Sequence, residues 1–192
     1  MLVTRHKGVA ESIARLRAFG VDRSHTERAV PGMYDVVELG LNYRMSEIQA
    51  AMGRRQLGRI QEILERREEN FKRLKSLLAG IEDISILDAA GEDASSSYYC
   101  LSAVLGQHLK LHRDEIISRL NEAGVGTSIY YPHPVPRLTY YKHKYGWDSE
   151  DYPEAVAISD GSIALPVGPH LAPADMDYIA NCFTGAIKEV RG

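Results

Sequence analysis

Three consecutive side chains, Asn42, Tyr43 and Arg44, carry groups suited to ligand binding in the first part of the chain. They place an amide, a phenol and a guanidinium directly before Ser46, where the spacing Ser-x-x-Gln predicts a helix start with a capping box. Because the N-terminus of a helix favours anions, these residues indicate a loop that could hold a phosphate. A polar loop with an aromatic plug remains the alternative.

A second group of candidate residues lies in the last third of the chain. Tyr130, Tyr131 and His133 follow a β-type run, and Tyr140 and Tyr141 come shortly afterwards. Aromatic rings with hydrogen-bonding tips can contact a sugar or a nucleotide. A packed, tyrosine-rich loop without a ligand explains the same pattern equally well.

Metal and disulfide chemistry is not indicated. His108 and His112 are four residues apart, but no carboxylate is placed to complete a site, so we predict exposed histidines and no metal. Cys100 and Cys182 do not have the C-x-x-C spacing of a thiolate zinc site. Two such cysteines are compatible with a reducing compartment, and we expect a cytoplasmic protein.

The composition is that of an ordinary globular protein, with 192 residues, 44% hydrophobic and 26% charged. A net charge of -3 provides no basic surplus for a nucleic-acid backbone, so we expect no nucleic-acid partner. No apolar run approaches the roughly 20 residues of a membrane-spanning helix. Arg5, His6 and Lys7 come too soon after Met1 for the apolar core of a signal peptide, so we expect neither export nor membrane insertion.

The elements before Ser46 are short. Met1–Thr4 is apolar and partly β-branched, as in a strand, and apolar residues at helical spacing predict a helix over Val9–Phe19. Gly20 is suited to end that helix. Residues 21–39 have no sustained periodicity and predict a long loop, of the kind that is usually functional or mobile.

From Ser46 the pattern predicts one long amphipathic helix over residues 46–79, in which Gly58 could produce a kink. Its apolar stripe is interrupted only by Arg67. At about 1.5 Å per residue such a helix spans roughly 50 Å, enough to bridge two lobes. A coiled-coil dimer helix is the alternative.

Residues 80–192 predict a small α+β domain. The expected order is two antiparallel strands, a helix, a third β-type run and a C-terminal helix. These elements cover Ile84–Leu87, Tyr98–Leu105, Arg113–Ala123, Gly126–Tyr131 and residues 173–190.

The string from Gly40 to Leu57 closely resembles the hallmark segment of the DegT/StrS-type sugar aminotransferases, which use pyridoxal phosphate (PLP). Met1–Thr4 and the helix after it resemble the strand and helix that follow the family's cofactor lysine. Ile129–Pro132 and Ala164–Val167 resemble later motifs of the family. The resemblance covers the whole chain and implies the C-terminal part of a fold-type I PLP-dependent aminotransferase, an α/β protein with an α+β C-terminal lobe.

The resemblance also implies a division of the chain. Residues 1–45 would be a remnant of the large PLP-binding domain, residues 46–79 the bridging helix, and residues 80–192 the small domain. The family's PLP lysine falls just upstream of Met1. Since no lysine of this chain has the setting of a catalytic one, we expect no catalytic residue and no activity from the chain alone.

In the complete enzyme the implied reaction moves an amino group from an amino-acid donor, such as glutamate, to a nucleotide-linked keto sugar. A non-catalytic remnant, or a module for dimerisation, is the alternative. Residue by residue, the resemblance places Asn42 across a homodimer against the PLP phosphate of the neighbouring subunit, with Arg44 nearby. Tyr131 and His133 fall on the substrate side, although many members carry a histidine where this chain has Pro136.

Overall fold

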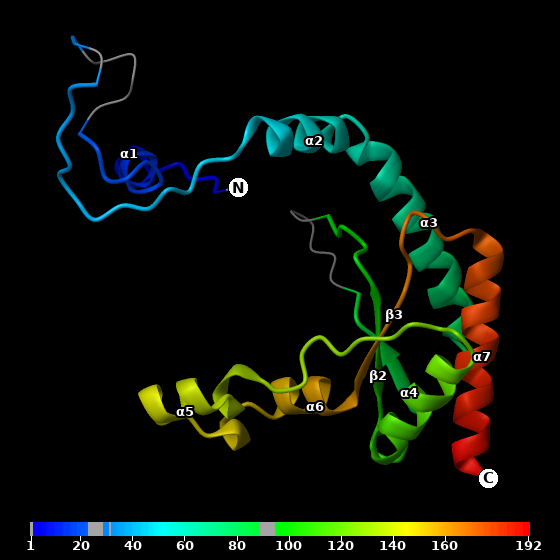
Figure 1. The fold of residues 1–192 in the computed structure, drawn as a ribbon. Coiled ribbons are helices and arrows are strands. Elements are labelled where there is room, and N and C mark those ends of the chain that lie inside the picture. Colours follow the sequence, from blue (N-terminus) through cyan, green and yellow to red (C-terminus); the bar gives the residue numbers. More distant parts are fainter. Residues whose placement is uncertain (1, 23–28, 31, 89–94) are drawn as a thin grey trace. The chain divides into compact units, whose positions relative to one another are not determined.

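A computed structural model describes residues 2–22, 29–30, 32–88 and 95–192 (Figure 1). The chain forms two compact units, Met1–Gly58 and Arg59–Gly192. Among the described residues, no helix is both long enough and apolar enough to cross a membrane.

The first unit contains two helices, α1 (Lys7–Leu16) and α2 (Glu47–Leu57). Helix α1 begins two residues before the predicted helix and ends three residues earlier than predicted. It ends early because Phe19 and Gly20 both adopt positive φ angles, of 68° and 72°, which direct the chain out of the helix. A strand was predicted over Met1–Thr4; residues 2–4 have no regular secondary structure, and Met1 lies outside the described residues.

The segment before Ser46 is held against the end of α1 by backbone hydrogen bonds. Leu41 donates to the Leu16 carbonyl at 2.7 Å and accepts from the Phe19 amide at 3.0 Å. Tyr43 donates to the Arg17 carbonyl at 2.9 Å. These bonds fix the backbone on both sides of residue 42.

This arrangement requires two glycines. A Cβ atom on Gly20 would lie 1.8 Å from the Glu38 carbonyl oxygen, and a Cβ atom on Gly40 would lie 2.0 Å from the Gly20 nitrogen. Neither distance is compatible with a side chain. The loop therefore reaches the end of α1 only because both positions are glycine.

The capping box predicted at Ser46 is confirmed. The Ser46 hydroxyl accepts from the Gln49 amide at 3.3 Å, and the Gln49 side chain accepts from the Ser46 amide at 2.9 Å. The continuous helix predicted over 46–79 is not observed. Helix α2 ends at Leu57 and α3 (Ile60–Leu78) follows after a turn at Gly58 and Arg59.

The interruption has a local cause. Glycine weakens a helix, and Arg59 has left helical geometry, with φ −113° and ψ 5°. Helix α2 has no buried residue among those described, so no packing within its unit opposes the break. The boundary between the two compact units falls at this turn.

The second unit is built around a three-stranded antiparallel sheet in the order β1 (Ile84–Ile86), β2 (Leu101–Leu105), β3 (Ser162–Leu165). The predicted antiparallel pairing of the first two strands is confirmed. The β-type run predicted at 126–131 contributes a single bridge, between Ser128 and Ala164 of β3.

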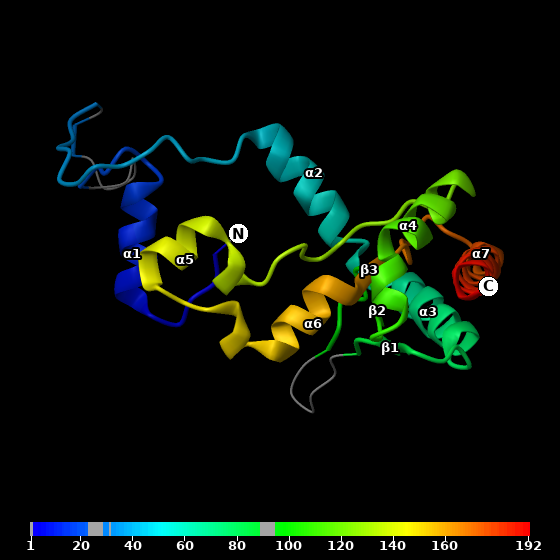
Figure 2. The same cartoon turned by 90° about the horizontal axis from the view of Figure 1, so that it is seen from below.

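The core lies between this sheet and three helices, α3, α4 (Arg113–Glu122) and α7 (Pro173–Arg191). Figures 1 and 2 show the three helices on the same side of the sheet. Alternate residues of β2 are fully buried because they point toward these helices. The helices predicted near 113–123 and 173–190 are thus confirmed.

The region from residue 132 to 152 contains short helices. They are α5 (Thr139–Tyr145) and two 3-10 turns, Val135–Arg137 and Ser149–Asp151; another 3-10 turn, Leu109–His112, precedes α4. Helix α6 (Pro153–Gly161) then leads into β3. In Figure 1, α5 and α6 lie on the opposite side of the sheet from α7.

A bidentate ion pair ties this region to α6. Arg137 donates to both carboxylate oxygens of Asp160, at 2.6 and 3.1 Å. Hydrogen bonding from Arg137 lowers the pKa of Asp160, and the nearby positive charge acts in the same direction. The pair fixes the loop that follows His133 against the helix.

This pair predicts a pH dependence of stability. The pKa of Asp160 is lower in the folded chain than its reference value of 3.8, which applies to the unfolded chain. The stabilisation by the ion pair is therefore fully present above pH 3.8. It is lost as the pH falls through the folded pKa. Both side chains are partly exposed, so we expect Asp160→Asn to destabilise by no more than about 1 kcal/mol at pH 7. Urea unfolding at pH 7 and pH 3 should show a difference that shrinks at pH 3, whereas exposed Asp151→Asn should show little difference at either pH.

Candidate functional site

The polar loop of the first unit presents the Asn42 amide in a defined orientation. Its Oδ1 atom accepts a hydrogen bond from Arg44 Nε at 3.2 Å. The Arg44 guanidinium in turn lies over the Phe19 ring, 5.4 Å from the ring centroid. With its oxygen occupied in this way, the exposed Asn42 amide directs its Nδ2 donor away from Arg44, and no described residue accepts from it.

These groups fit a phosphate. A neutral amide donor and a guanidinium with further N–H groups lie within one loop, and both side chains are exposed. The loop leads directly into the N-terminus of α2, whose dipole favours negative charge. The backbone hydrogen bonds to α1 hold the donors in place before any ligand arrives.

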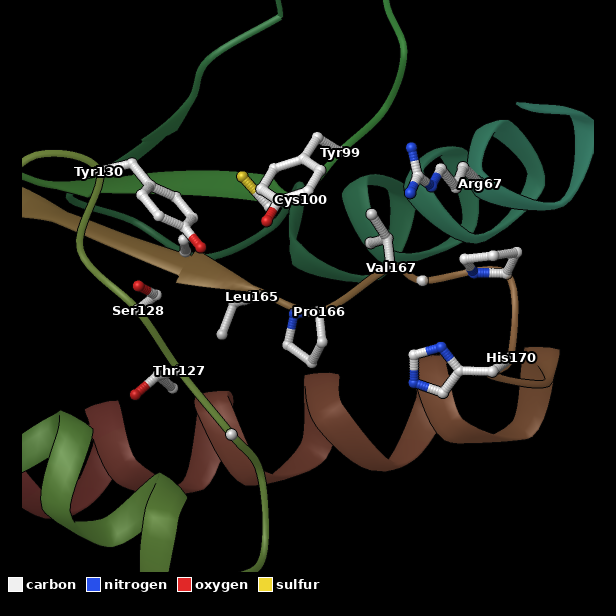
Figure 3. A pocket seen from close by; sticks show the side chains of 14 residues that line it. Arg67, Tyr99, Cys100, Thr127, Ser128, Tyr130, Leu165, Pro166, Val167 and His170 are labelled. Atoms are coloured by element: carbon white, nitrogen blue, oxygen red, sulfur yellow. The ribbon is translucent and has the colours of Figure 1, made fainter. Parts of the chain in front are cut away.

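A cavity of about 340 Å³ lies in the second unit (Figure 3). Its walls come from the end of β3 and the loop after it, from residues 126–130, and from Tyr99 and Cys100 before β2. Arg67 of α3 and His170 complete the lining. Segments far apart in the sequence therefore meet at this cavity.

The loop after β3 is fastened to α3 by one buried side chain. Asn70, only 2% exposed, donates from Nδ2 to the carbonyls of Gly168 and Leu171, both at 3.1 Å. A Cβ atom on Gly168 would lie 2.6 Å from the His170 ring, so this glycine allows the ring to lie against the loop in its present orientation. The cavity wall that carries His170 is therefore preorganised.

Two tyrosines form another wall. The Tyr99 and Tyr130 rings are 6.0 Å apart, and the neighbouring Tyr130 hydroxyl raises the pKa of Tyr99. Tyr99 therefore stays protonated at neutral pH. Each hydroxyl can donate one hydrogen bond to a ligand.

The residues predicted on the substrate side lie next to the cavity lining. Tyr131 is 72% exposed and its ring meets that of Tyr130 edge-on, with centroids 5.7 Å apart. His133 is exposed on the following turn. Neither residue lines the cavity, and Tyr130 lines it instead. Their role as substrate ligands stays a prediction.

The cavity residues Arg67, Tyr99 and His170 were not among the predicted site residues. The sequence contained one signal for Arg67, since it interrupts an otherwise apolar stripe. Tyr99 and His170 gave no such signal. They line the same cavity as Arg67 because β2 and the loop after β3 both pack beside α3.

The fold belongs to a known class, the fold-type I PLP-dependent aminotransferases. The structure of the putative sugar aminotransferase Spr1654 from Streptococcus pneumoniae, in its PMP-form, matches with a TM-score of 0.84 and 28% identity. That match covers 97% of this chain and 47% of the other. It confirms the fold class expected from the sequence.

More specifically, the chain belongs to the DegT/DnrJ/EryC1/StrS aminotransferase family, whose sequence model matches residues 1–184. The spore coat polysaccharide biosynthesis protein SpsC of Bacillus subtilis is 26% identical over 193 residues, which are 98% of this chain and 49% of SpsC. A GDP-perosamine synthase of Caulobacter vibrioides is 27% identical over 93% of this chain and 45% of its own length.

These matches confirm the family resemblance found in the sequence, and with it the dependence of the family on PLP. The chain spans about half the length of the curated relatives it matches.

Proposed function

We propose that this chain is the C-terminal portion of an aminotransferase that transfers an amino group from an amino-acid donor to a nucleotide-linked keto sugar. The observation that carries the proposal is the Asn42 loop, which presents an oriented amide donor beside Arg44 within the family match. The names of relatives from spore coat polysaccharide biosynthesis and perosamine synthesis support the substrate class.

In this proposal the side chains of the loop act on the cofactor phosphate. Asn42 donates from Nδ2 to the phosphate of PLP bound in the partner subunit, and Arg44 supplies positive charge beside it. PLP, when bound, carries the amino group and stabilises the developing carbanion. Tyr131 and His133, exposed on neighbouring turns, contact the sugar nucleotide.

The surface of the first unit supports a homodimer. Helix α2 has no buried residue among those described, although Ile48 is 75% exposed and Met52 is 66% exposed. Isolated exposed apolar residues are common, but a helix that buries none of them is typical of a missing packing partner. The rest of the enzyme and the second subunit would provide that partner.

The proposal is tested by comparing this chain with a longer protein that includes the region upstream of Met1. We expect the longer protein to bind PLP and to transfer an amino group from glutamate to a nucleotide-linked keto sugar. The 192-residue chain should do neither, because its lysines lack a catalytic setting. Activity in the short chain would contradict the proposal, and a longer protein that dimerises without PLP would support the non-catalytic module instead.

A further inference from the structure

Arg67 differs from its neighbours on α3, because none of the described residues is its acidic partner. Arg66 pairs with Glu62 at 3.3 Å, and Arg73 pairs with Asp177 at 2.5 Å. Within the part of the chain that the structure describes, no carboxylate lies within 4.0 Å of the Arg67 guanidinium. The guanidinium lies over the Tyr99 ring, 5.8 Å from the ring centroid.

The position of Arg67 makes the lack of a hydrogen-bond partner energetically unfavourable. It lies three and four residues before Asn70 and Phe71, which are both buried, so it shares the inward face of the helix. Its Nε atom is buried and has no hydrogen-bond partner among the described residues. A buried polar group without a partner is unfavourable. The other N–H groups of the guanidinium can donate to a ligand in the cavity that Arg67 lines.

The guanidinium lies at the edge of the cavity described above. Figure 3 shows it extending from α3 toward Tyr99. None of the described residues that line the cavity is an Asp or a Glu. Its polar side chains are donors or can act as donors, which suits an anion.

Hydrogen bonds also fix two walls of the cavity. Asn70 fastens the loop that carries His170, and the hydrogen bonds between Ser128 and Ala164, at 2.8 and 3.2 Å, fasten the opposite wall to β3. A preorganised site loses less conformational freedom on binding. The volume of about 340 Å³ is within the range of small-molecule sites.

We propose that this cavity binds a small oxyanion, a carboxylate or a phosphate group, with Arg67 as the charged anchor and the Tyr99–Tyr130 pair as a neutral donor. The planar guanidinium fork matches both groups, which can accept two parallel hydrogen bonds from it. The site is complete within the second unit. It therefore does not depend on the aminotransferase proposal.

The test uses the 192-residue chain without PLP, with inorganic phosphate and glutarate as separate probes. Binding is followed by calorimetry, and the site is located from the shifts of the Ser128 and Gly168 amide signals in NMR spectra. We expect saturable binding of at least one probe. Arg67→Met should weaken it about tenfold, since a charge-assisted hydrogen bond is lost.

The matched control is Arg73→Met, which removes the same charge from the same helix at an arginine already paired with Asp177. Its affinity should stay within about twofold of the original. Arg67→Lys keeps the charge without the planar fork and should also weaken binding, which provides the test if the methionine variant does not fold. Tighter phosphate binding would indicate a nucleotide or cofactor phosphate, and tighter glutarate binding an amino-acid carboxylate.

Absence of saturable binding would overturn the proposal, and so would equal losses in the Arg67 and Arg73 variants. Shifts confined to residues outside the cavity would overturn it as well. Since neither PLP nor catalysis is involved, these results are independent of whether the longer protein is an active aminotransferase.

Discussion

Replacing Asn42 by alanine is expected to weaken PLP retention ten- to a hundredfold in the complete dimeric enzyme. The substitution removes one charge-assisted hydrogen bond to the cofactor phosphate, worth roughly 1.5 to 3 kcal/mol. The loop itself should persist, because it is fixed by backbone hydrogen bonds between residues 16–19 and 41–43. Equilibrium dialysis against PLP measures the change. Asn121→Ala, at another exposed asparagine, is the control and should leave retention unchanged.

The effect should act across the dimer. Mixed dimers can be made in which one subunit carries Asn42→Ala and the other lacks the PLP lysine of the upstream region. The only remaining lysine then faces an intact Asn42, so about half the sites should work normally. With both changes in one subunit, the remaining lysine faces the altered residue and activity should be low. Equal activity in the two arrangements would show that Asn42 does not reach across the dimer.

Phe183→Ala should destabilise the second unit by about 3–5 kcal/mol, the largest change expected from any substitution considered. Phe183 is fully buried on α7, in the core shared with α3 and the sheet. Its removal loses apolar burial and leaves a cavity that neighbouring helices fill only in part. Urea unfolding of the 192-residue chain, followed by circular dichroism, gives the free energy of unfolding.

Lys188→Ala on the same helix is the control, because it introduces alanine at an exposed position. Lys188 is exposed, so its replacement should change the free energy of unfolding by no more than about 0.5 kcal/mol. A change below about 1 kcal/mol for Phe183→Ala would contradict the packing of the core described above.

Local physics explains which elements could be predicted from the sequence alone. The capping box at Ser46 involves residues three apart, and the alternation in Leu101–Leu105 and the helical spacing in Pro173–Arg191 each reflect one buried face. The family segment around Asn42 was recognisable for the same reason, since its residues are contiguous. The break at Gly58 was visible only as a possible kink. Whether a glycine interrupts a helix depends on packing, and α2 has no buried residue among those described to oppose it.

Tertiary structure decided the features that join distant residues. The fit of Gly20 against Glu38 and Gly40, which positions the Asn42 loop, depends on distances that no sequence spacing encodes. The cavity brings Arg67 beside Tyr99 and the loop after β3, segments separated by 32 or more residues. In the sequence, Arg67 was only an interruption of an apolar stripe. Folding makes Arg67 a candidate anion-binding residue. It buries the Nε atom without a partner among the described residues, and it places the guanidinium at a cavity whose described lining residues include no Asp or Glu.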